Sequence, residues 1–497
     1  MLQSEIYERA RLARDPRFDG LFFIGVATTG VYCRPICPAN SPKPGHVRFF
    51  PSAAAATEAG FRPCLRCRPE CAPGTPAWNG TSTTVRRGLR LIAGGALDEG
   101  NVESLAERLG VTGRHLRRLF TQHLGASPLA VARTQRLHFA KRLIDETRLP
   151  MSRVSAAAGY GSVRRFNDAF RKTYGRSPRD LRKACRSDPP AGDGVNGTSG
   201  ATLSLRLPYR EPFDWKGLLA FFAPRATPGV ERASGDTYQR VFTAGGRQGI
   251  LQVAPDAKPG FLALTIFGAS TESLFDLIQR TREVLDLDAP VADIGETLAS
   301  DETLHPLIAA KPGIRVPGVW SGFEVTVRAI VGQQVSVKGA TTVAGRIAAR
   351  YGEPLRLAGE SEAPEAGLSR AFPTPERLLR ARFTNLGLVR SRAETIRHVA
   401  AAVIAGDVRF DAAQDPAEFC RTLCGIRGIG PWTAQYVAMR ALKHPDAWPA
   451  TDLGLLKALE PPRRLKPEDL ARRAERWRPW RAYAAMLLWS SLAGSGG

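Results

Sequence analysis

The chain has 497 residues, of which 43% are hydrophobic, and a formal net charge of +23. This length exceeds what one ordinary hydrophobic core serves, so we expect about three or four domains. No apolar run reaches the roughly 18 residues that a membrane-spanning helix needs, so the sequence predicts no such helix. The excess of lysine and arginine indicates nucleic acid or another anionic surface as partner, with an arginine-rich genome composition as the alternative.

The N-terminal segment favours an intracellular chain. Residues 1–18, MLQSEIYERARLARDPRF, lack the apolar core of a secretory signal. We therefore expect a cytoplasmic protein that is associated with the nucleoid. In such a chain the eight cysteines favour metal binding or reactive thiols over disulfides.

Four of the cysteines form two close pairs. The stretch TTGVYCRPIC contains Cys33 and Cys37, and GFRPCLRC contains Cys64 and Cys67, with 26 residues between the pairs. Two short cysteine pairs on turns supply the four soft ligands that tetrahedral zinc prefers. On spacing alone, a purely structural zinc site is the simplest interpretation. Cys71 falls outside the pattern, and we expect it to be a bystander.

The residues around these cysteines resemble the N-terminal domain of the Ada family, the adaptive-response proteins for DNA alkylation. The resemblance covers residues 1–78. It implies that Cys33 is a zinc-bound thiolate that accepts a methyl group from a methylated DNA phosphate, and that Cys37, Cys64 and Cys67 are the other ligands. Zinc keeps a bound thiol deprotonated, so the sulfur remains nucleophilic. Methylation removes one negative charge and should therefore favour binding to the phosphate backbone.

The next segment, 79–186, is strongly basic and contains an internal repeat. HLGASP at 123–128 recurs as TYGRSP at 173–178, each time after a short helix, a glycine turn and a basic helix. This pattern is typical of a helix-turn-helix that occurs twice. Residues 80–186 contain 22 Lys/Arg and 8 Asp/Glu, so most of the excess charge lies here. The two copies resemble the AraC-type DNA-binding domain, which is all-helical.

This resemblance places two recognition helices at about 113–123 and 162–172. Their arginine side chains are candidates to contact bases or phosphates. These candidates are Arg114, Arg117, Arg118, Arg164 and Arg165. A merely solvated basic face is the alternative, and the repeat argues against it. Promoter DNA is then an expected partner, together with RNA polymerase if the protein activates transcription.

The second half of the chain changes character twice. Residues 187–202, SDPPAGDGVNGTSGAT, have the composition of a linker. Alternating segments such as QRVFTA and FLALTIFG then predict strands, and the pattern turns helical from about residue 300. We expect an antiparallel sheet with helices at 203–295 and an all-helical domain at 296–497. A low-complexity patch at 357–369 predicts a surface insertion.

The stretch CGIRGIGPWTAQYVAMR, 424–440, contains a turn with Gly428 and Gly430 between two helical runs, which is typical of a helix-hairpin-helix. Glycine lets the backbone approach a phosphate closely, and the following helix offers free N–H groups. Asp452 follows 22 residues after the turn. Together these features resemble the hairpin-plus-aspartate superfamily of base-excision DNA glycosylases. Most of 203–492 resembles its AlkA type, the 3-methyladenine glycosylases II.

The resemblance implies hydrolysis of the N-glycosidic bond of alkylated purines in double-stranded DNA, after the damaged base is flipped out. Asp452 would stabilise an oxocarbenium-like transition state and help a water attack, and aromatic side chains would stack on the cationic base. The matching aromatic positions are Phe221, Trp432, Tyr436 and Trp489, with core packing as the alternative. The implied DNA contacts are Gly428, Gly430, Thr433 and Gln334. The hairpin is also a candidate site for a monovalent cation.

Two positions depart from the AlkA pattern. Leu453 stands where an aromatic is expected, and Gln334 stands where an apolar wedge is expected. In the lyase branch a lysine occupies the position of Trp432, and the iron–sulfur branch needs four cysteines near the C-terminus, whereas none follows Cys424. We therefore expect a monofunctional hydrolase. We also expect the protein to act as a monomer. The alternative is a transcription regulator whose C-terminal half only binds damaged DNA.

Overall fold

The computed structural model divides the chain into two compact units, residues 1–211 with 256–279 and residues 212–255 with 280–497. The structure describes residues 2–73, 83–98, 100–184, 202–268, 270, 273–357, 367–411, 414–459 and 467–493. Residues 187–201 of the predicted linker, and most of the predicted insertion at 357–369, lie outside the described residues. Across the described ranges, no helix combines the length and apolar character needed to cross a bilayer.

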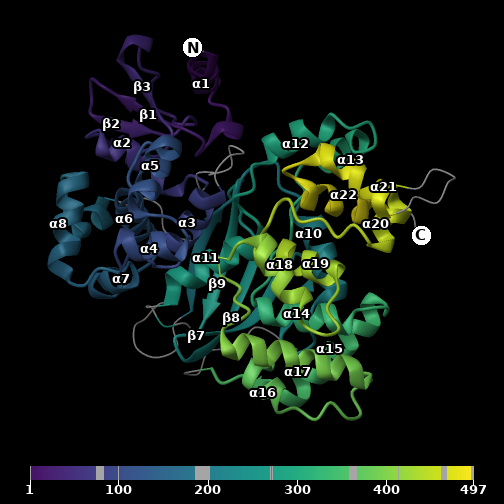
Figure 1. Ribbon diagram of the computed structural model, residues 1–497. Coiled ribbons are helices and arrows are strands. Elements are labelled where there is room, and N and C mark those ends of the chain that lie inside the picture. The colour runs from purple at the N-terminus through teal and green to yellow at the C-terminus, as the bar shows by residue number, and fades with distance from the viewer. Residues whose placement is uncertain are drawn as a thin grey trace. The chain divides into compact units, whose positions relative to one another are not determined.

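The first unit begins with helix α1 (Leu2–Ala13) and a small sheet of strand order β3-β1-β2-β4 (Figure 1, purple). The strands are β1 (Phe23–Val26), β2 (Val31–Cys33), β3 (Val47–Phe50) and β4 (Arg62–Pro63), and α2 (Ala53–Glu58) separates the last two in sequence. β1 pairs antiparallel with β2 and β3, whereas β2 and β4 run parallel. The rings of Tyr7 and Phe22 stack at 4.1 Å in the small core beneath.

Residues 83–184 form only helices among those described, as the basic repeat predicts. They are α3 (Thr83–Ala93), α4 (Val102–Arg108), α5 (Gly113–Leu124), α6 (Pro128–Glu146), α7 (Met151–Ala157), α8 (Val163–Tyr174) and α9 (Pro178–Ala184). The two predicted recognition helices correspond to α5 and α8. Each follows a short helix, α4 or α7, so the helix-turn-helix occurs twice.

The repeated sequence motif makes the same turn twice. Gly125 and Gly175 end α5 and α8 with φ of +65° and +67°, in the left-handed region that favours glycine. Two residues later, the hydroxyls of Ser127 and Ser177 each accept a hydrogen bond of 3.2 Å from the N–H three residues on. This cap begins α6 and α9.

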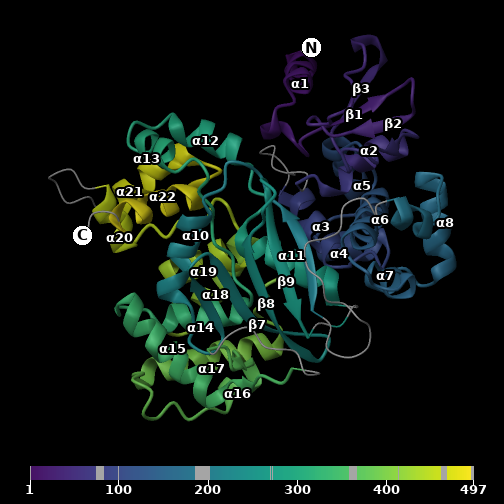
Figure 2. The same ribbon diagram turned by 180° about the vertical axis from the view of Figure 1, so that it is seen from behind.

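Two groups of antiparallel strands follow the helices. β5 (Leu203–Pro208) pairs with β9 (Phe261–Phe267) in the first unit. In the second unit, β7 (Thr237–Ala244) pairs with β8 (Arg247–Pro255) (Figure 2). It also pairs with β6 (Glu231–Ser234). The segments QRVFTA and FLALTIFG are confirmed as β7 and β9, whereas β6 was not expected from the sequence.

The second unit is otherwise built of helices around α14. Its helices are α10 (Trp215–Phe222), α12 (Val291–Ala299), α13 (His305–Ala310), α14 (Gly322–Val331), α15 (Val337–Tyr351), α16 (Pro375–Leu379), α17 (Arg390–Ala405), α18 (Pro416–Cys424), α19 (Pro431–Ala441), α20 (Leu453–Ala458), α21 (Pro467–Ala474) and α22 (Arg481–Ala493), and α11 (Leu274–Leu285) crosses the division between the units. A short pair, β10 (Glu353–Pro354) and β11 (Arg370–Ala371), follows α15. α14 buries eight of its ten residues and contacts α15, α17 and α19, as a central helix does. The multidomain α+β fold is confirmed.

We predict that Gly125→Ala destabilises the helix-turn-helix region more than Gly175→Ala. Both substitutions place an L-residue in the left-handed region, which costs about 1–2 kcal/mol. A Cβ on Gly125 would also lie 3.1 Å from the Pro51 and Ala55 side chains, whereas a Cβ on Gly175 meets nothing closer than Arg62 at 3.8 Å. Amide hydrogen exchange of α5 and α8 peptides measures both losses, and equal losses would contradict the packing argument.

Candidate functional site

Four thiols gather at one edge of the N-terminal sheet. Their Sγ atoms all lie within 4.8 Å of one another, and they belong to Cys33, Cys37, Cys64 and Cys67. A tetrahedral zinc site with bonds of about 2.3 Å has sulfur–sulfur edges of about 3.8 Å. The donor set and its spacing therefore fit zinc with only a small contraction.

The parallel pairing of two strands brings the cysteine pairs together. β2 ends at Cys33, and β4 leads directly into Cys64, whose N–H donates to the carbonyl of Tyr32 at 2.9 Å. Cys37 closes a turn by donating its N–H to the carbonyl of Arg34 at 3.1 Å. Since both strands end at the same edge, their pairing fixes the positions of Cys33 and Cys64, the first cysteine of each pair.

Arg34 connects the cluster to the interior of the domain. Its backbone N–H donates to Cys67 Sγ at 3.4 Å, its guanidinium donates to the Cys67 carbonyl at 3.1 Å, and it forms a buried ion pair with Asp19. Cys33 is only 9% exposed, whereas Cys37 and Cys64 are half-buried. Exposure therefore does not distinguish the predicted methyl acceptor, Cys33, from the other ligands.

Cys71 lies outside the group of four sulfur atoms. It is buried, and burial raises the pKa of its thiol to about 12. A thiol that stays protonated near neutral pH is a poor nucleophile and a poor metal ligand.

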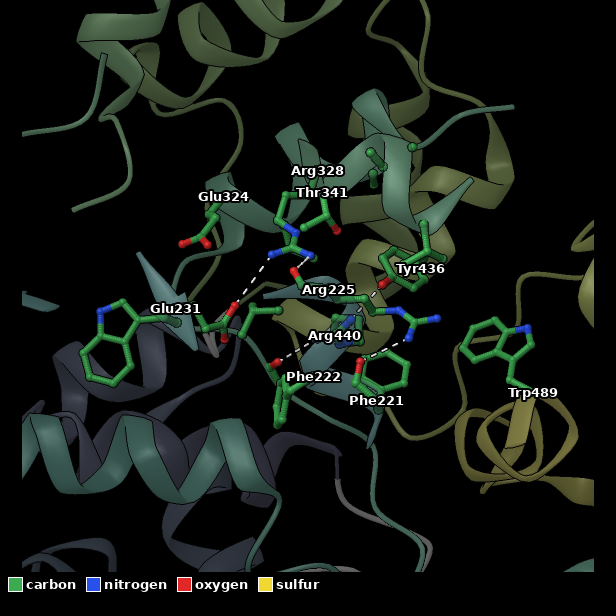
Figure 3. Close-up of a pocket in the computed structure, with 18 of the residues that line it drawn as sticks. Phe221, Phe222, Arg225, Glu231, Glu324, Arg328, Thr341, Tyr436, Arg440 and Trp489 are labelled. Carbon is green, nitrogen blue, oxygen red and sulfur yellow. Dashed lines mark hydrogen bonds and ion pairs between the residues drawn. The ribbon is translucent and has the colours of Figure 1, made fainter. Parts of the chain in front are cut away.

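A second candidate site is a cavity of about 420 Å³ in the second unit (Figure 3). Its lining comes from α10, β6, β7, α14, α15, α19, α22 and the N-cap residue of α20, so segments more than 200 residues apart in sequence meet here. The predicted pocket residues and the predicted catalytic carboxylate all line it. They are Phe221, Trp432, Tyr436, Trp489 and Asp452.

Asp452 accepts three hydrogen bonds at the wall of this cavity. Its Oδ1 accepts from the backbone N–H of Leu455 at 3.0 Å and from Trp489 Nε1 at 2.9 Å. Its Oδ2 accepts from Trp432 Nε1 at 2.7 Å. The carboxylate is thus the N-cap of α20 and also the partner of two indoles from α19 and α22, which fixes its orientation.

The aromatic walls are joined to this carboxylate. The rings of Trp432 and Tyr436 stack with centroids 5.4 Å apart and an interplanar angle of 6°, and Trp489 meets Tyr436 edge-on at 6.3 Å. Because both tryptophans also donate to Asp452, neither indole can rotate without losing a hydrogen bond. The three rings and the carboxylate form one rigid assembly.

Two arginines that were not predicted from the sequence, Arg225 and Arg440, lie against aromatic rings of this cavity. The guanidinium carbon of Arg225 lies 4.0 Å from the Phe221 ring centre, and that of Arg440 lies 4.9 Å from it. Arg440 also donates to the Tyr436 hydroxyl at 2.7 Å. Burial disfavours the Tyr436 phenolate, but the charges of Arg440, Arg225 and Arg328 outweigh it and lower the pKa of Tyr436. Arg225 follows Phe221 by four residues, and Arg440 follows Tyr436 by four. This helical spacing could have revealed both arginines from the sequence.

The hairpin requires glycine for a steric reason. Gly428 has φ of +92°, and a Cβ on it would lie 2.1 Å from Thr395 Oγ1. Gly430 is the N-cap of α19 and provides no side-chain cap. Thr433 is only 2% exposed, and its hydroxyl accepts from Gln333 Nε2, which also donates to the Gly428 carbonyl. The side chain of Thr433 therefore supports the turn, and the α19 backbone N–H groups are what the hairpin presents outward.

The two departures from the AlkA pattern both lie on the surface. Gln334 is exposed in the turn between α14 and α15, with φ of +54°. A left-handed backbone is uncommon for a residue other than glycine, and such conformations cluster at functional sites. Leu453, next to Asp452, is 73% exposed. Both are therefore placed where a DNA duplex could contact them.

All five predicted DNA-contacting arginines of the helix-turn-helix region are exposed on α5 and α8. They are Arg114, Arg117, Arg118, Arg164 and Arg165. Arg117 forms an exposed ion pair with Glu103 at 2.6 Å, which solvent screens. The opposite faces of the two helices carry the buried core residues Leu116, Phe120, Phe166 and Phe170.

The fold and the two sites define a DNA-binding repair protein of several domains. Residues 7–70 match the metal binding domain of Ada, 105–184 a helix-turn-helix domain, 204–321 the AlkA N-terminal domain and 327–482 the HhH-GPD superfamily of base excision DNA repair proteins. These matches confirm the resemblances seen in the sequence.

Whole-chain similarity points to one family. The chain is 40% identical, over 97% of its length and 95% of the relative's, to the "Probable bifunctional transcriptional activator/DNA repair enzyme AlkA" of Mycobacterium tuberculosis. It is 33% identical to DNA-3-methyladenine glycosylase 2 of Escherichia coli, over 57% of this chain and 95% of that one. A 3-methyladenine DNA glycosylase from Archaeoglobus fulgidus shares the fold over 57% of this chain and 96% of that one, with a TM-score of 0.50 at 22% identity. The chain belongs to the family of bifunctional transcriptional activator/DNA repair enzymes AlkA.

We predict that Cys37→Ser removes zinc from the purified protein and that Cys71→Ser does not. Cys37 contributes one of the four sulfur donors, whereas Cys71 lies outside the cluster. A small domain depends on its metal for stability, so Cys37→Ser should also lower the melting temperature of the zinc domain. Elemental analysis checks the first point, and a full zinc content in Cys37→Ser would contradict the assignment.

Proposed function

We propose that the protein hydrolyses the N-glycosidic bond of alkylated purines, of the 3-methyladenine and 7-methylguanine type, in double-stranded DNA. The observation that carries this proposal is the Asp452 carboxylate, held by three N–H donors at the wall of an aromatic cavity. A flipped base fits a cavity with aromatic walls. An oriented carboxylate beside the sugar stabilises the positive charge that develops as the bond breaks, and it can help a water attack.

The reaction is a monofunctional hydrolysis. A lyase needs an amine that forms a Schiff base with the sugar. Among the described residues that line the cavity none is a lysine, and the position that carries the lysine in the lyase branch is Trp432, whose indole N–H is bonded to Asp452. A water molecule is therefore the nucleophile, and the carboxylate is the group that can polarise it.

We propose a second function at the four cysteines, which is the acceptance of a methyl group from a DNA methylphosphotriester. One zinc ion, when bound, supplies a site in which the thiols stay deprotonated. Cys33 Sγ attacks the methyl carbon, the carbon–oxygen bond breaks, and its electron pair stays on the phosphate oxygen, which leaves an ordinary phosphodiester. The reaction is stoichiometric because the resulting thioether has no route back to a thiolate.

The same chain regulates transcription in this proposal. The exposed arginines of α5 and α8 bind promoter DNA, and methylation of the zinc site strengthens that binding by removing a negative charge. RNA polymerase is the expected further partner, and the protein acts as a monomer in the cytoplasm, on the nucleoid. At the hairpin, the α19 N–H groups bind a phosphate, and nearby backbone carbonyls hold a monovalent cation.

We predict that Asp452→Asn reduces base release by about 10²–10³-fold and leaves DNA binding nearly intact. The substitution removes the negative charge that faces the sugar. It also turns one oxygen into an amide group whose N–H must oppose the indole N–H of Trp432 or Trp489. Removal of a negative charge near phosphate does not weaken binding. Single-turnover release of 3-methyladenine and 7-methylguanine from methylated duplex measures the effect.

Asp415→Asn is the matched control for this experiment. Asp415 is also an N-cap aspartate, on α18, but it is exposed and lies outside the cavity. Its variant should release base at the wild-type rate. If Asp452→Asn does so as well, Asp452 is only a helix cap. If the wild-type protein itself releases no base, the alternative holds, in which the C-terminal half only binds damaged DNA.

We predict a single methyl adduct on the peptide that contains Cys33 after incubation with DNA that carries methylphosphotriesters. Mass spectrometry identifies the site, and an adduct on Cys37, Cys64 or Cys67 instead would refute the assignment. The affinity for promoter DNA should rise with methylation, and the gain should shrink as salt is added because it is electrostatic. The Cys71→Ser variant should behave as the wild type in both measurements.

A further inference from the structure

The cavity is rich in arginine, although the bases it is proposed to bind are themselves positively charged. Four arginines line it, and two of them have acidic partners. Arg240 forms a buried ion pair with Glu324, and Arg328 lies 3.6 Å from the Glu231 carboxylate. Arg225 and Arg440 have no acidic partner among the described residues, and both face the Phe221 ring (Figure 3).

Arg440 is fixed in place by its hydrogen bonds. Its guanidinium donates to the carbonyls of Pro317 and Gly318 and to the Tyr436 hydroxyl. Arg440 is buried, and each of its three guanidinium nitrogens already donates one of these hydrogen bonds, so it contributes its charge from a fixed position. Its hydrogen bond fixes the Tyr436 hydroxyl, and Arg225 is the other arginine of the cavity without an acidic partner among the described residues.

Arg225 keeps hydrogen-bond donors free. Its Nη1 donates to the Phe221 carbonyl at 3.1 Å, while Nε and Nη2 donate to no other described residue. Arg328 donates to the backbone carbonyl of Arg225, which holds its main chain. In Figure 3 the guanidinium extends between Phe221 and Tyr436 on the side that faces Trp489. The free N–H groups are therefore directed to the space where a flipped base meets these rings.

A guanidinium with free donors distinguishes purines by their C6 substituent. Alkylated guanines present O6, which accepts a hydrogen bond from the guanidinium. Alkylated adenines present an N6 amino group, which is itself a donor and therefore cannot accept one. Both kinds of base are cationic after alkylation of a ring nitrogen, so repulsion from Arg225 and Arg440 acts on both. The difference that remains is hydrogen bonding, and arginine paired with guanine is the commonest specific contact in DNA recognition.

We propose that Arg225 makes this cavity selective for alkylated guanines over alkylated adenines, by donating from Nε or Nη2 to O6 of the flipped base. The proposal rests on the glycosylase function proposed above and names its substrate preference. Arg225 is then a specificity-determining residue, while Asp452 performs the chemistry on either base.

The test compares two bases that carry the same methyl group. 3-Methylguanine and 3-methyladenine are both methylated at N3, and both are present in duplex DNA treated with a methylating agent. Single-turnover release of each from this DNA is quantified by chromatography for the wild type, Arg225→Ala and Arg225→Lys. We expect Arg225→Ala to lower the ratio of 3-methylguanine to 3-methyladenine release about fivefold or more. Arg225→Lys, which keeps the charge without the planar fork, should lose most of the preference too.

The controls separate this proposal from a failure of the fold or of the function. Arg247→Ala, an exposed arginine at the start of β8 outside the cavity, should keep the wild-type ratio. Melting temperature and affinity for abasic-site duplex report whether the Arg225 variants are folded. If Arg225→Ala slows the release of both bases equally, Arg225 only supports the Phe221 ring and the proposal is wrong. If the wild type releases neither base, the glycosylase function fails first.

Discussion

The second unit is organised around a carboxylate that accepts three N–H donors. Asp452 takes them from the backbone of α20 and from indoles on α19 and α22, so three helices are oriented by one side chain. Preorganised groups of this kind stabilise developing charge without rearranging during the reaction. The Asp452 carboxylate also fixes the Trp432 indole, and Tyr436 stacks on that indole. The cavity therefore has a fixed carboxylate in its wall, and the Arg225 guanidinium lies over the Phe221 ring in the same cavity.

In the first unit, the pairing of a small sheet holds four thiols close together. The parallel strands β2 and β4 end side by side, and Arg34 ties the second cysteine pair to a buried aspartate. The Ser52 hydroxyl donates to the Leu124 carbonyl at 2.6 Å, which joins the zinc domain to the end of α5. The domain that holds the sulfur cluster thus directly contacts a helix of the helix-turn-helix region.

Much of this architecture was predictable because it depends on neighbouring residues. The cysteine spacing, the two glycine–serine turns after α5 and α8 and the GIG hairpin are local patterns whose geometry a few residues determine. The strand β6 was not predicted, since a segment as short and polar as ERAS has no alternating pattern of its own. The methyl-acceptor role of Cys33 came only from the family resemblance, and burial does not single it out.

The sequence by itself determined which residues are the candidates for the chemistry: four thiols, one aspartate after a hairpin, and four aromatics, and the structure brings each set together. Only the tertiary structure decided what surrounds them. The sequence predicts Thr433 as a DNA contact, and only the structure shows that its side chain is 2% exposed and accepts a hydrogen bond from Gln333, 100 residues earlier. Arg440 is fixed by carbonyls 122 and 123 residues away. Burial, charge pairing and free donors depend on segments that are distant in the chain, and local patterns contain no information about those neighbours.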